Sequence, residues 1–544
     1  MNVECLDYRD LPGQHPLFSQ YLYDYDSVGS FYPEPACLDL ESLKQRADSV
    51  INNPPSFPRD QLVELMKAFN QKVGAGEETF RNLEKLKSSQ AVVVVTGQQT
   101  GFLGGPAFTM YKALTAIRLT QLLNEEGYCA VPVFWLASDD SDFQEVHSTF
   151  FFGEDEEPFP VRYPDVDADR SRMAGTVSLE KVEECLKYLQ TRGLKGEFQS
   201  EVLDMLRETY SPNHVFSEGL GAWLSRLFEP YGLVLFDPLT PGYKRNLKSL
   251  FHTAVNQRRD IVQALIQRAD LLREKGFDPQ VRVVDSESLI FWKEGDKRYK
   301  LEYGEKGGYE KKTDLSVRLS EEELLKELDD EHLAPNVLLR PILQDHLFPT
   351  VAYVGGPSEV AYFAQIGAIS PFWNQEMAVF PRLGVTIVDR KSQRLLKKYG
   401  ISASDLLKLT SDEVAHKVLQ GRDSGKLLKQ LELVQGSMRA QLKSLRDEFQ
   451  EVDPTVAEML VGTEKKIDYQ IEKIEKRFVS NYRTRTENLG QHLNYLYSRL
   501  YPMGKLQERV VNFNQFLAEE GPSLVGRLME AVNPLCPSHH LIYL

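Results

Sequence analysis

The feature that most constrains the fold of this chain is a pair of short apolar runs separated by a glycine-rich segment and a helical pattern. Residues 91–95 are alanine and β-branched valine, which is typical of a strand buried on both faces. Residues 110–123 carry apolar or small side chains at helical spacing, and residues 131–137 form a second apolar run. Strand, turn, helix and strand in succession predict a βαβ unit, for which a doubly wound parallel sheet is the favoured frame.

The length of the chain and its pattern of apolar residues predict the domain in which this βαβ unit lies. A single core stops growing at roughly 250–300 residues, so a chain of 544 residues is expected to form two or more units. We predict an α/β, Rossmann-like core over residues 1–390 with two inserted connecting subdomains. The first, at about 152–215, is helical, and the second, at about 280–335, alternates like an antiparallel meander laid over the cleft. Three further apolar runs are predicted as strands of the core: 233–236, 337–339 and 351–354.

The C-terminal third has a different pattern, in which apolar residues recur every three or four positions on both sides of Asp453 and Pro454. Asp at the N-cap followed by Pro in the first turn is a helix-start signal. We therefore predict linker helices at 391–423, an antiparallel α-helical coiled-coil hairpin at 424–503, and a segment at 504–544 that returns to the core. The stepped residues of the first helix are Leu431, Val434, Met438, Leu442, Leu445, Phe449 and Val452.

The predicted hairpin also bears on assembly. If its second helix is continuous over residues 455–501, it is about 70 Å long at 1.5 Å per residue and must protrude from the body. A protruding hairpin with an apolar seam is typical of a homodimer formed through a coiled coil. The alternative is a monomeric arm that buries its seam within itself.

Charge and cysteine usage exclude several classes of protein. The formal net charge of −15 disfavours nucleic acid and membrane surfaces as main partners, although a few focused Arg and Lys side chains can still bind a small anion. The five cysteines are scattered, which argues against a disulfide framework and against a structural zinc site. No His-Glu-x-x-His spacing occurs, so no metal site is expected. The sequence has no signal-type or membrane-spanning apolar run, and a cytoplasmic protein is expected.

The first candidate site follows the run at 91–95. A glycine-rich loop at the carboxyl end of a buried strand lets a ligand approach the backbone, and Gln side chains can bind a carboxylate, an amide or an adenine edge. The spacing matches neither G-x-G-x-x-G nor G-x-x-x-x-G-K-[ST], and a tight turn without a ligand is the alternative. Candidate ligand-binding residues are Thr96, Gly97, Gln98, Gln99, Gly101, Gly104, Gly105 and Thr109, with Lys112 as a candidate catalytic contact to phosphate or developing negative charge.

The second candidate site is the acidic segment that follows the run at 131–137. Its carboxylates, Asp139, Asp140 and Asp142, are expected at the same edge of the sheet. Clustered carboxylates can bind a substrate ammonium group, hold Mg²⁺ for a nucleotide, or act as a general base. The alternative is helix capping, because Asp and Ser are favoured N-cap residues.

Two further segments are predicted at this edge. Arg340 and Gln344 are placed at the end of the strand predicted at 337–339, and Arg is the side chain best shaped for bidentate recognition of carboxylate or phosphate. Gly355, Gly356 and Glu359 form a second glycine-rich junction between a strand and a helix. Two such junctions in one sheet predict two halves of one cleft.

Several motifs together resemble one family. They are T-G-Q-Q-x-G-x-x-x-G-P from Thr96, T-x-x-K-A from Thr109, P-V-F-W-x-A from Pro132 with its acidic tail, N-V-L-L-R-P from Asn336 and A-Y-V-G-G-P-x-E from Ala352. In motif order, length and C-terminal coiled coil, the chain is similar over nearly its whole length to the bacillithiol-biosynthesis cysteine-adding enzymes, also called cysteine ligases.

The resemblance implies a Rossmann-like core with inserted segments, similar to class I aminoacyl-tRNA synthetases, and a coiled coil that forms the dimer. It also implies an activity, the joining of the carboxyl of cysteine to the amine of glucosaminyl malate in the last step of bacillithiol synthesis. In that comparison residues 105–112 occupy the place of the synthetase nucleotide-binding signature, but its two His residues and a K-M-S-K-S segment are absent here. The acidic segment, often Glu-Asp-His-Asp in the family, has Ser141 in place of the His.

These assignments combine into a mechanistic hypothesis. A free carboxylate must be activated before it forms an amide, and adenylation by ATP, with Mg²⁺, is the economical route on this fold, although no motif identifies the cosubstrate. In this hypothesis residues 101–105 and Lys112 hold phosphate, and Gln98 and Gln99 orient the acyl donor. The acidic segment binds an ammonium or deprotonates the amine, and Arg340 pairs with the malyl carboxylates. The competing hypotheses are a synthetase-like nucleotidyltransferase acting on another amino acid and a coiled-coil scaffold with a ligand-binding α/β body.

Overall fold

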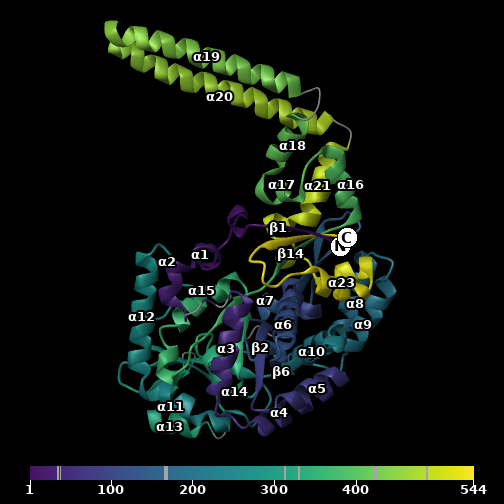
Figure 1. Cartoon of the computed structure of the whole chain (residues 1–544), viewed down its shortest axis with the longest axis vertical. Coiled ribbons are helices and arrows are strands. Elements are labelled where there is room, and N and C mark those ends of the chain that lie inside the picture. Colours follow the sequence, from purple (N-terminus) through teal and green to yellow (C-terminus); the bar gives the residue numbers. More distant parts are fainter. Residues whose placement is uncertain are drawn as a thin grey trace. The chain divides into compact units, whose positions relative to one another are not determined.

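The computed structural model describes residues 1–33, 36, 38–164, 170–311, 314–328, 331–420, 425–485 and 488–544, with the side chains of 314–317 and 482–485 excepted (Figure 1). The described chain divides into two compact units. The larger unit consists of Met1–Val385 and Glu508–His540, and the smaller unit of Thr386–Gln507 and Leu541–Leu544. The chain therefore leaves the larger unit after Val385, returns to it at Glu508, and ends with four residues in the smaller unit.

A parallel sheet of five strands forms the frame of the larger unit. Its order is β13-β12-β2-β3-β6, and every neighbouring pair is parallel. The first of these strands in the chain is central, the next two lie on one side and the last two on the other, which is the order of dinucleotide-binding folds. The prediction of a Rossmann-like, doubly wound sheet is confirmed. Its strands are β2 (Ala91–Gln99), β3 (Cys129–Ala137), β6 (Val234–Phe236), β12 (Thr350–Gly355) and β13 (Val379–Pro381).

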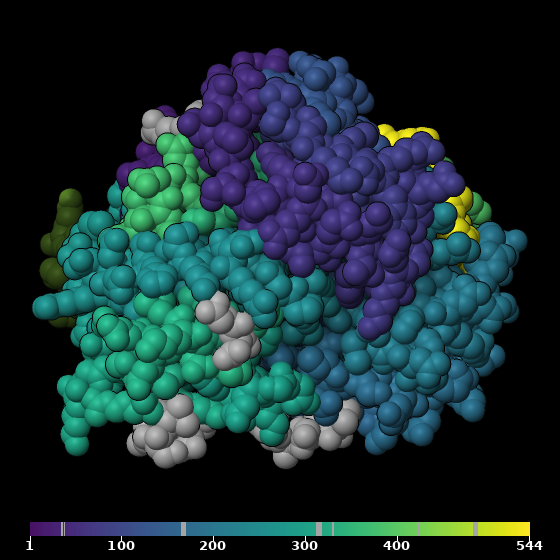
Figure 2. Space-filling model, turned by 90° about the horizontal axis from the view of Figure 1, so that it is seen from below, coloured from purple at the N-terminus to yellow at the C-terminus, as the bar shows by residue number. Residues whose placement is uncertain are grey.

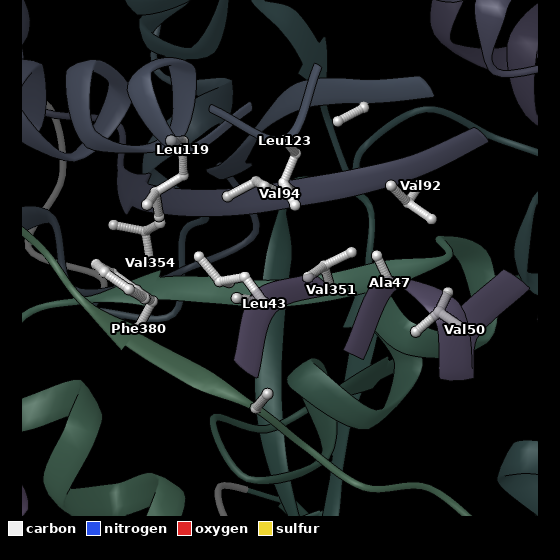
Figure 3. Packing of buried hydrophobic residues seen from close by; sticks show 14 residues of the cluster. Leu43, Ala47, Val50, Val92, Val94, Leu119, Leu123, Val351, Val354 and Phe380 are labelled. Atoms are coloured by element: carbon white, nitrogen blue, oxygen red, sulfur yellow. The ribbon is translucent and has the colours of Figure 1, made fainter. Parts of the chain in front are cut away.

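The central strand is buried on both faces, as its valine run predicts. Val92 and Val94 of β2 pack in one cluster with Leu119 and Leu123 of α6 (Phe108–Glu125) and with Leu43 and Ala47 of α3 (Leu40–Asn52) (Figure 3). Burying each such valine or leucine side chain contributes about 1.5–3 kcal/mol before entropy is counted. The cluster fixes the positions of β2 and α6, and thereby of the turn that connects them.

Two insertions extend this frame. The first carries a hairpin and three helices: β4 (Ser148–Phe152), β5 (Pro158–Arg162), α8 (Val182–Arg192), α9 (Gln199–Thr209) and α10 (Phe216–Leu227). The second contains an antiparallel sheet of order β10-β9-β8-β7-β11, as the alternating pattern predicts. Its strands are β7 (Glu287–Glu294), β8 (Lys297–Tyr303), β9 (Tyr309–Lys311), β10 (Asp314–Leu319) and β11 (Leu333–Pro335). Helices α11 (Lys248–Asn256), α12 (Arg258–Glu274) and α13 (Glu321–Lys326) accompany them.

The strand predicted at 337–339 is wrong. The chain forms β11 earlier and then enters α14 (Leu339–Leu347), so Arg340 lies in the first turn of a helix. The physical reason is the side chain of Asn336, whose Oδ1 accepts hydrogen bonds of 3.0 Å from the backbone N–H groups of both Leu338 and Leu339. An Asn that caps free N–H groups in this way starts a helix.

The remaining elements of the larger unit cover the frame. In the space-filling view the N-terminal residues, in purple, form a continuous part of the surface beside teal residues from the middle of the chain (Figure 2). The N-terminal elements are β1 (Asn2–Leu6), α1 (Pro16–Tyr23), α2 (Tyr25–Val28), α4 (Arg59–Lys72) and α5 (Glu77–Lys85). Those near the sheet's carboxyl edge and the C-terminus are α7 (Phe143–Val146), α15 (Pro357–Ile366), α22 (Phe513–Glu520) and α23 (Ser523–Ala531). Strands β14 (Gly384–Val388) and β15 (His539–Tyr543) include the unit boundaries.

The smaller unit is helical. It contains α16 (Arg390–Tyr399), α17 (Ala403–Lys408), α18 (Ser411–Gln420), α19 (Gly425–Val452), α20 (Pro454–Arg485) and α21 (Leu489–Leu500). The predicted antiparallel hairpin is present, because Arg439 of α19 forms an ion pair of 2.8 Å with Asp468 of α20. Asp453 caps the second helix, and its Oδ1 accepts a 3.0 Å hydrogen bond from the Thr455 N–H.

The continuous helix considered for residues 455–501 is wrong. Helix α20 ends at Arg485 and α21 begins at Leu489, and Asn488 between them has a φ of 76°, which no α-helix contains. The arm is therefore shorter than the periodicity alone implies. None of the described helices is both long and apolar enough to cross a lipid bilayer.

Candidate active site

A cavity of about 590 Å³ lies where β2, β3 and β12 end. In open α/β sheets ligands bind outside the carboxyl ends of the strands, at the point where the strand order reverses. Here that point is the β2–β12 pair, because the chain builds outward from β2 to β6 and then crosses to β12. The predicted two-sided cleft is confirmed: its wall includes Gly97, Gln98 and Gln99 of β2, Asp139 and Asp140 after β3, and Gly356 and Glu359 after β12.

Lys112 lies in this wall but is not a free cation. Its Nζ donates hydrogen bonds to the Gly97 carbonyl at 2.8 Å and to Gln98 Oε1 at 2.9 Å, and it forms an ion pair with Glu359. These contacts occupy the three donors of the ammonium. Burial lowers the pKa of Lys112, while the charge of Glu359 acts in the opposite direction. Lys112 therefore orients Gln98 and neutralises Glu359, and it links both halves of the cleft.

Glu359 is held from three sides. Besides Lys112, its carboxylate accepts a 2.7 Å hydrogen bond from the Gly356 N–H and a 2.6 Å hydrogen bond from the Tyr353 hydroxyl. Burial raises the pKa of Glu359, but the charge of Lys112 and the Gly356 N–H outweigh it, so that the pKa lies below its usual value. Glu359 is thus an ionised, fixed part of the wall at the start of α15.

The acidic segment divides into an inner and an outer part. Asp139 is buried and lines the cavity, and no described residue forms a hydrogen bond or ion pair with its carboxylate. Asp140 also lines it, but both of its oxygens are engaged, one by Gln99 Nε2 at 2.7 Å and the other by Arg298. Asp142 is exposed and stands at the start of α7, away from the wall. Of the three predicted carboxylates, Asp139 and Asp140 line the cavity and Asp142 does not; Asp142 occupies the N-cap position of α7, but its side chain makes no capping hydrogen bond.

Arg340 lies between two aromatic rings of the cavity. Its guanidinium carbon is 5.6 Å from the centre of the Trp135 ring and 5.0 Å from that of Tyr353. Its Nη1 donates a 3.3 Å hydrogen bond to Gln344 Oε1. Gln344 is fully buried and lies outside the wall, where it orients Arg340, and its contact with ligand stays a prediction.

The glycine-rich loop does not reach the cavity, which corrects the prediction for Gly101, Gly104, Gly105 and Thr109. All four are buried and outside the wall. The side-chain amide of Asn512 donates hydrogen bonds of 2.9 Å to the carbonyls of Leu103 and Gly105. The Gly104 N–H donates a 2.6 Å hydrogen bond to the Tyr210 hydroxyl. The loop is the tight turn considered as the alternative.

Close packing explains two of the glycines. Gly104 has a φ of 92°, and a Cβ there would lie 2.9 Å from the Trp223 ring. At Gly97 a Cβ would lie 2.7 Å from the Trp135 carbonyl on the adjacent strand. Gly97 is in the wall, whereas Thr96 and Gly355 are buried beside it. The Thr96 hydroxyl donates a 2.9 Å hydrogen bond to the Val354 carbonyl and ties β2 to β12.

Three arginines of the wall were missed by sequence reasoning. Arg298 comes from β8 of the inserted sheet, Arg382 follows β13, and Arg509 comes from the segment after the smaller unit. Arg382 could have been found from its position after an apolar strand, but Arg298 and Arg509 reach the cavity only through tertiary folding. Arg298 pairs with Asp140, and Arg382 Nη2 donates a 2.6 Å hydrogen bond to Glu508. Of the described carboxylates, none forms an ion pair with Arg340 or Arg509, so the cavity presents cationic groups although the chain is acidic overall.

Comparison with known proteins gives the family. The model of the bacillithiol biosynthesis BshC N-terminal Rossmann-like domain matches residues 1–383, and that of the BshC C-terminal coiled-coil domain matches residues 385–544. The chain belongs to the BshC family. A BshC relative from Koribacter versatilis, named "Putative cysteine ligase BshC", is 32% identical over 551 residues, which cover 100% of both chains. Relatives with the same name are 31% identical over 546 residues in Solibacter usitatus, again with 100% of both chains covered, and 29% identical over 541 residues in Salinibacter ruber, covering 97% of this chain and 96% of the relative.

The two BshC domain models divide the chain close to the boundary between the two units after Val385. The second model also includes residues 508–540, which fold as part of the larger unit. This segment supplies Arg509 to the cavity wall. The coiled-coil part of a BshC chain thus returns a side chain to the Rossmann-like body.

Proposed function

We propose that this protein is a ligase that joins the carboxyl of cysteine to the amine of glucosaminyl malate, forming the carbon–nitrogen amide bond of the last step in bacillithiol biosynthesis. The family and the names of the relatives support the pathway and the ligase class. The observation that carries the proposal is the combination, in one cavity, of two arginines that form no ion pair with a described carboxylate, Arg340 and Arg509, and a buried carboxylate, Asp139, that forms no ion pair or hydrogen bond with a described residue. Such a site suits a substrate pair with carboxylates on one side and an amine on the other.

Arg340 and Arg509 bind the malyl carboxylates in this proposal. A guanidinium recognises a carboxylate through two parallel N–H donors, with more geometric selectivity than an ammonium. The rings of Trp135 and Tyr353 and the side chain of Gln344 hold the Arg340 guanidinium in place before substrate binds. A preorganised cation loses less side-chain entropy on binding.

Asp139 is the general base in this proposal. As the carbon–nitrogen bond forms, the attacking amine must lose a proton, and a carboxylate in hydrogen-bond reach can accept it. Asp140 is less suited, because Gln99 and Arg298 already occupy both of its oxygens. Asp140 instead orients Gln99, whose amide also donates a 3.0 Å hydrogen bond to Glu145.

The ATP hypothesis does not fit the residues it named. The loop at 101–105 is buried, Lys112 is fully engaged, and the Gly356 N–H at the start of α15 is taken by Glu359. The described residues therefore do not form the phosphate site that was predicted, and we assign no step to a nucleotide. The carboxyl of cysteine still requires activation by a cosubstrate, so that one of its oxygens leaves with the activating group when the amine nitrogen bonds to the carbonyl carbon.

We propose that the protein works as a homodimer in the cytoplasm. Several stepped residues of α19 are exposed, among them Val434, Met438 and Leu445, so the hairpin does not bury its whole apolar seam within itself. A second copy with the same surface is the simplest cover for such a seam. The described cysteines Cys5, Cys129, Cys185 and Cys536 are free thiols, which suits a reducing compartment.

Thiol profiling of cells that lack the gene tests the proposed reaction. Loss of bacillithiol together with accumulation of glucosaminyl malate is expected, because the acceptor is made but not used. If these cells contain bacillithiol at its normal level, or if they lose bacillithiol while glucosaminyl malate stays at its normal level, the protein acts at another step.

A further inference from the structure

Two cysteines and a histidine from opposite ends of the chain meet in the larger unit. Cys5 lies on β1, and Cys536 and His540 lie in the last ten residues of the unit's C-terminal segment. The Sγ atoms of Cys5 and Cys536 are 3.4 Å apart, and both lie within 4.8 Å of a ring nitrogen of His540. None of these residues lines the active-site cavity.

The histidine ring indicates a ligand. His540 Nδ1 is 3.0 Å from the Ser538 carbonyl, a contact in which Nδ1–H donates and the lone pair is left on Nε2. His540 Nε2 is buried, and no described atom meets hydrogen-bond geometry with it, although the backbone of Asn533 lies close enough to raise the pKa of the ring. Buried polar atoms are rarely left unpaired. Histidines that bind metals commonly donate the other ring N–H to a backbone carbonyl in this way.

The sulfur atoms suit a shared metal better than a bond to each other. A disulfide requires an S–S distance of about 2.05 Å, whereas two thiolates bound tetrahedrally to Zn²⁺ at about 2.3 Å lie about 3.8 Å apart. The observed 3.4 Å is much closer to the second value. Cys5 is exposed, which leaves room for a water as the fourth ligand.

We propose that Cys5, Cys536 and His540 bind one Zn²⁺ ion, which ties β1 to the C-terminal segment of the larger unit. The inference departs from the expectation of no metal site, because that expectation rested on spacing along the sequence, and these ligands come from the two ends of the chain. The segment that contributes Cys536 also borders a small void lined by Arg382, a residue of the active-site wall. The metal therefore fastens a segment next to the active site without taking part in the reaction.

Metal binding by the purified full-length chain tests the proposal. The protein is stripped with a chelator under reducing conditions, supplied with Zn²⁺, freed of excess metal and analysed for bound zinc. One equivalent per chain is expected for the wild type and for Cys129→Ser, a matched control outside the cluster. Cys5→Ser and Cys536→Ser are each expected to lose it. Replacement by Co²⁺ should give thiolate-to-cobalt charge-transfer absorption in the wild type and the control, and none in Cys5→Ser.

A thermal-unfolding series separates binding from misfolding. Cys5 is exposed, so the metal-free Cys5→Ser variant is expected to unfold at the temperature of the metal-free wild type. Addition of Zn²⁺ is expected to raise the Tm of the wild type by several degrees and to leave that of Cys5→Ser unchanged. Wild-type protein that retains no zinc after removal of excess metal, or zinc content that is equal in the wild type and both cysteine variants, would overturn the proposal. A Cys5–Cys536 disulfide in protein that binds no Zn²⁺ after reduction would overturn it as well.

Discussion

At the scale of single residues, the site is built from charged groups that differ in how completely they are paired. Lys112 and Glu359 form an ion pair in the cavity wall, and the carboxylate of Asp140 is bound by Gln99 and Arg298. Arg340 and Asp139 form no direct ion pair with a described residue, although the charge of Glu359 acts on Arg340 and that of Asp139 acts on Lys244. Paired charges shape the cavity, and the unpaired ones are available to substrate.

Replacement of Arg340 tests whether the charged groups without an ion-pair partner are the ones that bind substrate. We expect Arg340→Lys and Arg340→Ala to raise the KM for the malyl substrate by about 10- to 100-fold, because a charge-assisted contact contributes about 1.5–3 kcal/mol and lysine lacks the planar fork. Steady-state kinetics with the malyl substrate varied measures the effect. Arg273→Ala, which removes an exposed arginine paired with Asp270, is the control and should behave as the wild type. An unchanged KM in Arg340→Ala would remove Arg340 from the binding site.

Lys244 makes stability depend on pH. Its Nζ is buried and has no hydrogen-bond partner among the described residues, and burial lowers the pKa of Lys244 from 10.5 to about 7. Between pH 7 and about 10.5 the unfolded chain therefore binds the proton that the folded chain has lost, and stability rises with pH in that window. Below pH 7 both the folded and the unfolded chain carry the proton, and the full cost of burying the charged Lys244 ammonium is subtracted from the free energy of unfolding.

We predict that Lys244→Met increases the free energy of unfolding, most strongly below pH 7 and progressively less toward pH 10. Urea unfolding at several pH values measures the difference from the wild type. Lys248→Met, a change four residues away, is the control and should show no comparable pH dependence. A difference that stays constant across the window would contradict the lowered pKa of Lys244.

At the scale of elements, the sequence predicted the sheet well and the loop chemistry poorly. The runs at 91–95, 131–137, 233–236 and 351–354 became strands because apolar β-branched patterns report burial directly. The run at 337–339 failed because one capping side chain, Asn336, outweighed local apolarity. The role of the glycine-rich loop was predicted wrongly because its hydrogen-bond partners are distant in the sequence. Tyr210 is 106 residues from Gly104 and Asn512 is 409 residues from Leu103, so no local pattern reveals these contacts.

The structural role of the loop leads to a stability prediction. Asn512→Ala removes one donor from the Leu103 carbonyl, which keeps the Asn514 side-chain amide, and removes the side-chain donor of the buried Gly105 carbonyl, at a cost of about 1–3 kcal/mol for the group left unpaired. We expect a lower midpoint of urea unfolding and little change in the KM of either substrate at temperatures where the variant is folded. Asn213→Ala at an exposed position is the control. A variant with unchanged stability and a raised KM would instead support a ligand-binding loop.

At the scale of the whole molecule, the active-site cavity is lined by residues that are far apart in the sequence and are brought together by the insertions and the returning C-terminal segment. Arg298, Arg382 and Arg509 reach one cavity from the inserted sheet, the last core strand and the returning C-terminal segment. No spacing rule connects them, so only the folded chain reveals the cationic side of the site. The same reasoning applies to the proposed zinc ligands.

Assembly gives a prediction at this scale. Val434 and Met438 are exposed on one face of α19, with 47% and 41% of their surface accessible. We expect the double variant Val434→Asp with Met438→Asp to convert a dimer to a monomer, because charges cannot be buried in a coiled-coil seam without partners. Light scattering coupled to size-exclusion chromatography measures the mass. Gln441→Asp, a charge added at another exposed position of the helix, should leave the dimer intact, and a wild-type protein that is already monomeric would contradict the proposal.

We propose that cysteine is joined to glucosaminyl malate in the cavity at the β2–β12 switch point, with Asp139 as the base. Bacillithiol measured in cells that lack the gene and carry either wild-type protein or a variant tests it most directly. Wild-type protein and Asp142→Asn, whose side chain lies outside the cavity, should restore bacillithiol, whereas Asp139→Asn at equal protein level should leave glucosaminyl malate unconsumed. Full restoration by Asp139→Asn, or bacillithiol at its normal level in the cells without the gene, would contradict the account.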